Sequence, residues 1–122
     1  MRLDWTVAGA VWGFLGVLLG AFGAHAIELG PEAQGWWETA TLYHLIHAPL
    51  LVLGGVMRRT GHLGNTPLAL LLGGSVIFSG TLYAMALGAP RILGAITPIG
   101  GLGLLLGWAG LALAGWRDAK QA

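Results

Sequence analysis

The chain contains no cysteine. This absence excludes disulfide bonds, thiolate metal sites, iron–sulfur clusters and thiol nucleophiles. It also leaves open whether the protein works in an oxidising or a reducing compartment. Any metal binding or catalysis must therefore depend on other side chains, and the histidines are the first candidates.

Charged residues are scarce as well, since they make up 9% of the 122 residues, whereas 56% are hydrophobic. Water-soluble domains carry charge at roughly a quarter of their positions, so this chain has too little polar surface to cover a soluble globule. Its net charge of +1 provides no basic field for nucleic acid, and we expect no nucleic-acid partner. The composition predicts a protein covered by lipid.

Long apolar runs take the place of the missing charge. Each is near the roughly 20 residues that an α-helix needs to cross a bilayer, whereas barrel strands are shorter and alternate. The sequence predicts an all-α integral membrane protein, with four transmembrane helices in one compact antiparallel bundle. Residues 31–38 are expected to form a first helical turn that lies in the interface and leads into the second helix. The expected spans cover residues 5–27, 39–57, 67–88 and 95–116.

The few cations sort by side of the membrane. Arg91 lies in the third loop, and the first loop is acidic, with Glu28, Glu32 and Glu38. Because loops rich in Lys and Arg stay in the cytoplasm, we expect N-in and C-in orientation in a cell membrane. The cations expected on the cytoplasmic side are Arg2, Arg58, Arg59, Arg117 and Lys120.

Glycine supplies 22 residues, many at alternating spacings of three and four along a helix. Such smooth stripes let helices approach closely in lipid, where van der Waals contact drives their association. We expect the first and fourth helices to pack against each other, with a lesser contribution from Gly73 and Gly80 of the third. The alternative is that one stripe faces another subunit. The two stripes consist of Gly9, Gly13, Gly16, Gly20 and Gly23, and of Gly100, Gly103, Gly107 and Gly110.

Polar side chains within the spans gather in the half of the bilayer expected to face outward. Such residues need hydrogen-bond partners or a function, because hydrocarbon provides neither donors nor acceptors. We expect a pocket that binds a small ligand or a lipid headgroup. Its candidate residues are His25, Tyr43, His47, Ser79, Tyr83 and Thr97.

A metal site is an alternative, with His25, His44 and His47 as ligands for a metal ion or haem b. At 1.5 Å rise per residue, His25 and His47 lie at different depths, and no Glu-x-x-His pattern accompanies them. We therefore expect no cofactor and favour hydrogen-bonded structural histidines. Ser79 lacks a nucleophile elbow and an acid, so the sequence leans against an enzyme.

The motifs as a set resemble the small bacterial membrane proteins of the domain of unknown function 423, whose eukaryotic relative is transmembrane protein 256. The resemblance implies a multi-span protein of the bacterial cytoplasmic membrane, without established catalytic residues. The family pattern falls on the six pocket candidates but not on His44, which favours His47 as the important buried histidine. The strings that carry the resemblance are GAFGAHA at 20–26, Tyr43, His47-Ala48, FSGTLY at 78–83, TPIGG at 97–101 and Gly107-Trp108.

Three functional hypotheses follow. The first is a non-enzymatic membrane protein whose outer polar pocket binds a small ligand or a lipid headgroup. The second is an accessory subunit, in which the glycine stripes dock onto a homo-oligomer or a larger membrane complex. The third is a metal- or haem-binding redox module that uses the three histidines. In each case membrane lipid is an expected partner.

Overall fold

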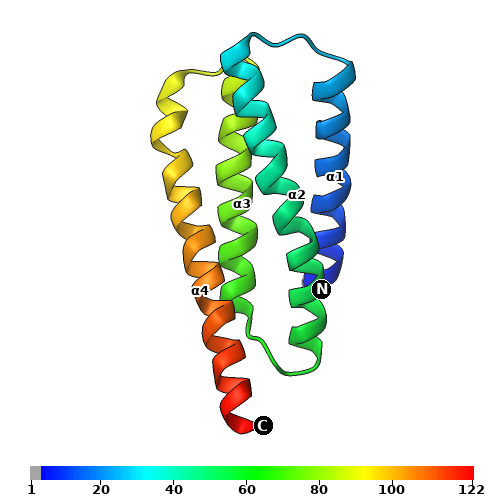
Figure 1. Cartoon of the computed structure of the whole chain (residues 1–122), viewed down its shortest axis with the longest axis vertical. Coiled ribbons are helices and arrows are strands. Elements are labelled where there is room, and N and C mark those ends of the chain that lie inside the picture. The colour runs from blue at the N-terminus through cyan, green and yellow to red at the C-terminus, as the bar shows by residue number, and fades with distance from the viewer. Residues whose placement is uncertain (1–3) are drawn as a thin grey trace.

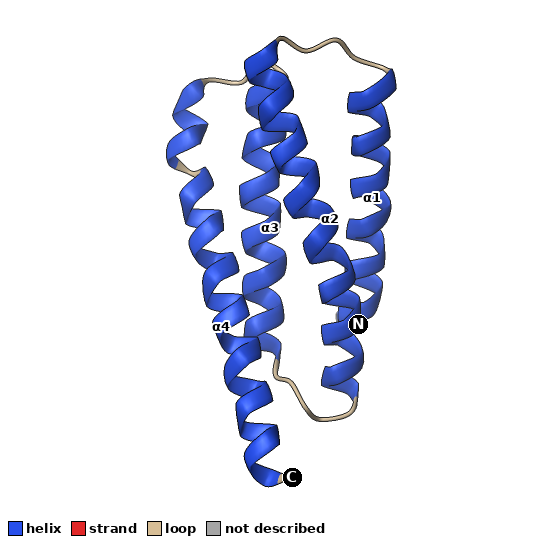
Figure 2. Cartoon of the chain, viewed as in Figure 1, coloured by secondary structure: helices blue, strands red, loops and turns tan. Residues whose placement is uncertain are grey.

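The computed structural model describes residues 4–122, which fold into helices joined by short loops (Figures 1 and 2). Four helices are long and apolar enough to cross a membrane, as predicted. A short 3-10 helix, η1 (Arg91–Ala95), leads into the last of them. The four long helices are α1 (Trp5–His25), α2 (Pro31–Arg59), α3 (Asn65–Ala86) and α4 (Thr97–Gln121).

The four helices stand in a row in chain order, each antiparallel to the next, so that both termini lie at one end (Figure 1). Short loops favour this order because they keep consecutive helices adjacent. Helix α1 packs on α2, α2 on α3, and α3 on α4. The expectation that the first and fourth helices pack against each other is wrong, since they form opposite edges of the row.

The glycine stripe of α1 faces α2. A Cβ atom at Gly9 would lie 2.7 Å from the backbone nitrogen of Val52, and one at Gly23 would overlap the Trp37 indole. These glycines let the two backbones touch. The remaining members of the stripe face the same helix, with Gly13 next to Ala48, Gly16 next to His44 and Leu45, and Gly20 next to Thr41.

The stripe of α4 faces α3 in the same way. A Cβ atom at Gly100 would lie 2.5 Å from the backbone nitrogen of Phe78, and Gly107 and Gly110 meet Leu71 and Pro67. The matching glycine on α3 is Gly74, whose added Cβ would lie 2.7 Å from the carbonyl oxygen of Gly100. Gly73 and Gly80, expected to pack, have nothing within 4 Å, so the contact surface is offset from the predicted one.

The helix boundaries differ from the expected ones at several ends. Helix α2 begins at Pro31, so residues 31–38, expected as an interfacial turn leading into this helix, form its first turns. Helix α4 continues to Gln121 beyond the apolar span. At the start of α4, the Thr97 hydroxyl donates to the carbonyl of Leu93 at 3.1 Å, which joins α4 to η1.

Ion pairs hold the two ends of the row. At the end that carries both termini, Asp4 caps α1 by accepting from the Thr6 amide at 2.9 Å, and it also pairs with Arg59 of α2. The Arg59 guanidinium and the Thr6 amide lower the pKa of the Asp4 carboxyl. At the opposite end, Arg91 pairs with Glu32.

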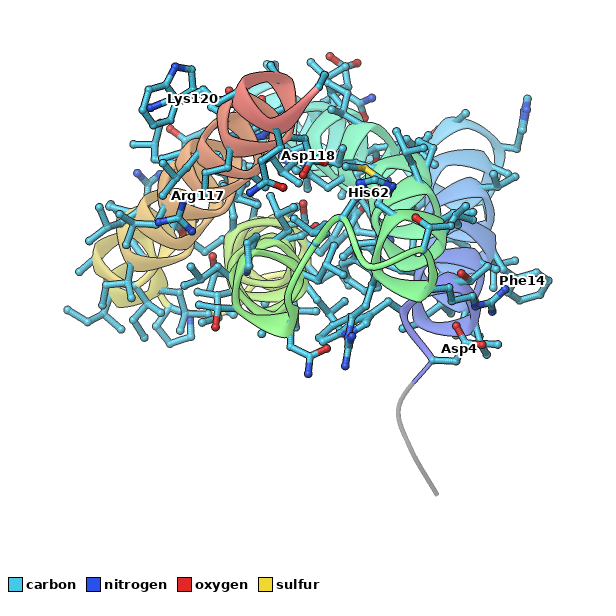
Figure 3. All side chains as sticks on the ribbon, turned by 90° about the horizontal axis from the view of Figure 1, so that it is seen from below. Asp4, Phe14, His62, Arg117, Asp118 and Lys120 are labelled. Carbon is cyan, nitrogen blue, oxygen red and sulfur yellow. The ribbon has the colours of Figure 1, made fainter. Side chains whose placement is uncertain are left out.

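Large apolar side chains cover the outside of the row. Phe14 is 68% exposed and points away from the other helices (Figure 3). Val7, Val11 and Val17 on α1 are more than half exposed as well. An apolar surface of this extent is stable in contact with lipid and not with water.

Candidate functional site: a groove between α2, α3 and α4

The six pocket candidates do not converge on one cavity. His25 is exposed at the end of α1, on one edge of the row. Ser79 and Tyr83 are buried, and Thr97 bonds to Thr81, with 2.6 Å between their hydroxyl oxygens. Only Tyr43 and His47 line a common groove. The predicted set therefore separates into structural residues and one smaller candidate site.

His44 is the centre of the structural set and is fully buried. Its Nε2 atom lies 2.7 Å from the carbonyl oxygen of Trp12, and its ring stacks on the Trp12 indole with 3.7 Å between centroids. Because a carbonyl only accepts, Nε2 carries a proton. Its Nδ1 lies 3.0 Å from the hydroxyl of Tyr83 on α3. His44 therefore ties α1, α2 and α3 together, a role that the preference for His47 missed.

Further polar contacts join the first three helices on either side of His44, including one directly from α1 to α3. The Trp12 indole donates to Ser75 at 2.8 Å, and the Ser79 hydroxyl donates to the carbonyl of Ala40 at 2.8 Å. The Trp37 indole donates to the carbonyl of Leu19 at 2.9 Å. These donors have partners within the protein, as polar groups in a membrane require. Their role is to hold the helices together.

His47 differs because its bonds run toward α4. Its Nδ1 lies 2.6 Å from the carbonyl of Tyr43, so Nδ1 carries the proton. Its Nε2 accepts from the indole of Trp108 at 3.0 Å. The ring is therefore neutral, with both nitrogens occupied. The His47–Trp108 bond bridges α2 and α4, which are not neighbours in the row.

The groove lies along this bridge and has a volume of about 580 Å³. Its α4 wall is open at Gly101, which has no side chain, and Leu105 on that wall is 69% exposed. Tyr43 packs on Phe78 with 4.5 Å between ring centroids. The groove residues are Tyr43, His47, Phe78, Pro98, Gly101, Leu102, Leu104, Leu105 and Trp108.

One polar group in the groove lacks a partner. Tyr43 is 38% exposed, and no residue among 4–122 hydrogen-bonds its hydroxyl. Tyr43 lies four residues after Thr39, where the apolar span of α2 begins, and therefore about 6 Å inside the edge of the hydrocarbon. The hydrocarbon around a hydroxyl at this depth offers no hydrogen-bond partner. It favours a bound molecule that offers an acceptor or a donor.

The histidines do not fit a metal or haem site. Within residues 4–122, no three His, Cys, Asp or Glu side chains come together. Both ring nitrogens of His44 and of His47 are in hydrogen bonds with protein atoms. A ligating imidazole needs a free lone pair on one nitrogen, and neither ring has one.

Four apolar antiparallel helices, tied by satisfied polar contacts, define a small multi-pass integral membrane protein. The family described as "Protein of unknown function (DUF423)" matches residues 19–101 of the chain. The chain belongs to this family, as its motifs predicted.

The curated relatives carry membrane-protein names. The chain is 44% identical over 111 residues to a UPF0382 membrane protein of Staphylococcus epidermidis, covering 88% of this chain and 91% of the relative. It is 39% identical over 108 residues to the UPF0382 inner membrane protein YgdD of Escherichia coli, with coverage of 84% and 82%. It is 37% identical over 107 residues to the UPF0382 membrane protein YwdK of Bacillus subtilis, with coverage of 84% and 87%. No solved structure matches the chain significantly.

Proposed function

We propose that this protein is a non-enzymatic membrane-embedded binding protein, whose lateral groove takes a small amphipathic molecule from the bilayer. The unpartnered Tyr43 hydroxyl inside an apolar groove is the observation that carries the proposal. The ligand would have an apolar body and one hydrogen-bonding group. A binding pocket that is mostly apolar with one or two placed polar groups is the usual form of a small-molecule site.

The depth of the groove favours a small amphiphile over a lipid headgroup. His47 lies 16 residues after the start of the 29-residue helix α2, near its centre. Headgroups lie at the bilayer surfaces, so a headgroup would not reach this level. The bonds of His47 within residues 4–122 support binding over catalysis, because its proton is held by the Tyr43 carbonyl and its other nitrogen by Trp108, which leaves it unable to activate a nucleophile.

Filling the groove should release the ligand. A Cβ atom at Gly101 would lie 3.8 Å from Phe78, so the longer side chain of Gly101→Leu extends into the groove. Gly73→Leu is the matched control, because Gly73 has nothing within 4 Å. We expect organic extracts of purified wild type and of the Gly73 variant to contain the same amphiphile, and the Gly101 variant to lack it by mass spectrometry.

Tyr43→Phe gives the second arm of this experiment. Loss of one hydrogen bond should lower retention of the amphiphile by roughly tenfold, because such a bond contributes about 1 kcal/mol or slightly more. Equal extracts from the Gly101, Tyr43 and Gly73 variants would refute the groove as a binding site. Thermal unfolding of each variant in detergent shows that the chain is folded in every arm.

A second candidate function is that of an accessory subunit. It is favoured by the open edge of the row, where α1 packs mainly on α2, reaches α3 through side-chain bonds such as Trp12 to Ser75, and leaves large apolar side chains such as Phe14 exposed. A second copy of the chain or a larger complex would cover this face. A stoichiometric partner that co-purifies in mild detergent distinguishes this function from ligand binding.

We also propose that both termini of the chain face the cytoplasm. Arg58, Arg59, Arg117 and Lys120 lie at the end that carries both termini, whereas Arg91 lies at the other; Arg2 falls outside the described residues. The positive-inside rule then supports N-in and C-in. The chain has no cysteine, so a single His62→Cys variant can be labelled alone. Labelling by an impermeant maleimide only in opened cells supports the orientation, and labelling in intact cells contradicts it.

A further inference from the structure

A second groove lies at the end of the row that carries both termini, between the start of α3 and the last turns of α4. It has a volume of about 430 Å³, within the usual range of ligand sites. Gly110 and Pro67, which both line the groove, approach each other closely and join the two helices there. Leu70, Leu106 and Leu113 give the groove an apolar wall, and Arg117 is the charged residue that lines it.

The polarity of this groove changes along the membrane normal. Leu106 lies 11 residues before Arg117 on α4, which places it about 16 Å deeper. Leu106 is 50% exposed and Leu113 is 45% exposed, so both are open to a lipid chain. The groove is therefore apolar at depth and cationic at the surface.

Arg117 is the cation that lines this groove, and it makes no hydrogen bond or salt bridge with residues 4–122. Arg59 pairs with Asp4, and Arg58 donates to Asn65. Lys120 lies over the Trp116 ring, with its Nζ 4.5 Å from the centroid.

The adjacent carboxylate does not neutralise Arg117. Asp118 is 2.9 Å from the ring nitrogen of His62. Arg117 and Asp118 lie on different sides of α4, and Asp118 is turned toward His62 (Figure 3). The guanidinium of Arg117 is thus available to an anion at the membrane surface.

We infer that this groove binds a phospholipid with an anionic headgroup. An acyl chain lies along Leu70, Leu106 and Leu113, and the phosphate pairs with Arg117. A guanidinium suits this role because its planar donors match two phosphate oxygens. Charge complementarity selects the headgroup, while the apolar wall selects a lipid over a free phosphate. This site is separate from the groove at Tyr43 and does not depend on the function proposed for that groove.

Native mass spectrometry of the purified protein tests the inference, with phosphatidylglycerol and phosphatidylcholine of identical acyl chains as probes. We expect the first bound phosphatidylglycerol to be favoured about fivefold over phosphatidylcholine. Arg117→Gln should abolish this preference. Arg117→Lys, which keeps the charge, should retain it, as should the matched control Lys120→Gln, which removes a charge three residues away outside the groove.

Three results would overturn the inference: equal affinity of the wild type for both lipids, an unchanged preference in Arg117→Gln, or an equal loss in Lys120→Gln. Inorganic phosphate added in excess provides the last arm. If it displaces phosphatidylglycerol, the site recognises phosphate alone and the apolar groove has no part in binding.

Discussion

Gly74→Ala should destabilise the protein by about 2 kcal/mol, whereas Gly73→Ala should leave its stability unchanged or slightly higher. The Cβ atom added at Gly74 would lie 2.7 Å from the carbonyl oxygen of Gly100 and 2.7 Å from the backbone nitrogen of Leu104. Backbone atoms cannot rotate away as side chains do, so α3 and α4 must separate. Overpacking of this kind typically costs about 1–3 kcal/mol.

The neighbouring glycine makes the comparison sharp because the two variants share the same chemistry and depth. An added Cβ atom at Gly73 meets nothing within 4 Å. There the substitution only removes the backbone freedom of glycine, which favours the helix by roughly 0.5–1 kcal/mol. Unfolding by a denaturing detergent, followed by tryptophan fluorescence, measures both variants. Equal destabilisation at both positions would contradict the packing of α3 on α4.

His44→Ala should destabilise the protein by about 3 kcal/mol, and His25→Ala by less than about 0.5 kcal/mol. His44 is fully buried, so its removal leaves a cavity and takes a partner from the Tyr83 hydroxyl. His25 is exposed and makes no hydrogen bond through its side chain with the described residues. Substitution of an exposed side chain without such contacts rarely changes the free energy of unfolding by more than about 0.5 kcal/mol.

The same denaturation assay compares the two histidine variants. His47→Ala provides a third point, because His47 is nearly as buried but bonds only to α2 and α4. If His44→Ala proves as stable as His25→Ala, the buried network does not hold the first three helices together. A larger loss at His47 than at His44 would restore the order that the family pattern suggested.

The number of membrane-spanning helices could be predicted from the sequence because hydrophobic length alone determines it. A stretch of about 20 apolar residues has few alternatives in a membrane. The same criterion fails at helix ends. Helix α2 begins at Pro31 and not at residue 39, because polar residues such as Glu38 remain helical outside the hydrocarbon.

The glycine spacing identified the contact faces of α1 and α4 but not their partners. A glycine stripe on one helix indicates only that another helix approaches it closely, and not which helix. The two similar stripes suggested mutual packing, whereas each lies on its neighbour in the chain. On α3 the contact is made by Gly74 and not by Gly73, and adjacent glycines cannot be told apart without knowing the rotation of the helix.

The polar residues could be selected by type, but their pairing depends on tertiary structure. Trp12 reads as an ordinary apolar residue of the first span, yet both its carbonyl and its indole take part in the network at His44. Only two of the groove residues could be identified from the sequence. Tyr43 and His47 are one turn apart and were selected, whereas its walls are leucine, phenylalanine and glycine residues without any distinguishing pattern.

The groove depends on the open row of helices, because it exists only if α4 packs on α3 and leaves α1 at the far edge. Paired cysteines in this cysteine-free chain test it in native membranes. A Cβ atom at Gly13 would lie 3.4 Å from that of Ala48, close to disulfide geometry. Gly103 on α4 packs against Gly74 of α3. The next residue of α3, Ser75, bonds Trp12 of α1, so positions 13 and 103 lie at a similar depth in the bilayer.

The measurement is the number of free thiols per chain after mild oxidation, read as a gel shift with a maleimide-linked polymer. The Gly13→Cys/Ala48→Cys variant should lose both thiols within one chain. The Gly13→Cys/Gly103→Cys variant should keep both. A disulfide within one chain between positions 13 and 103 would place α1 against α4, close the row into a ring and contradict this arrangement.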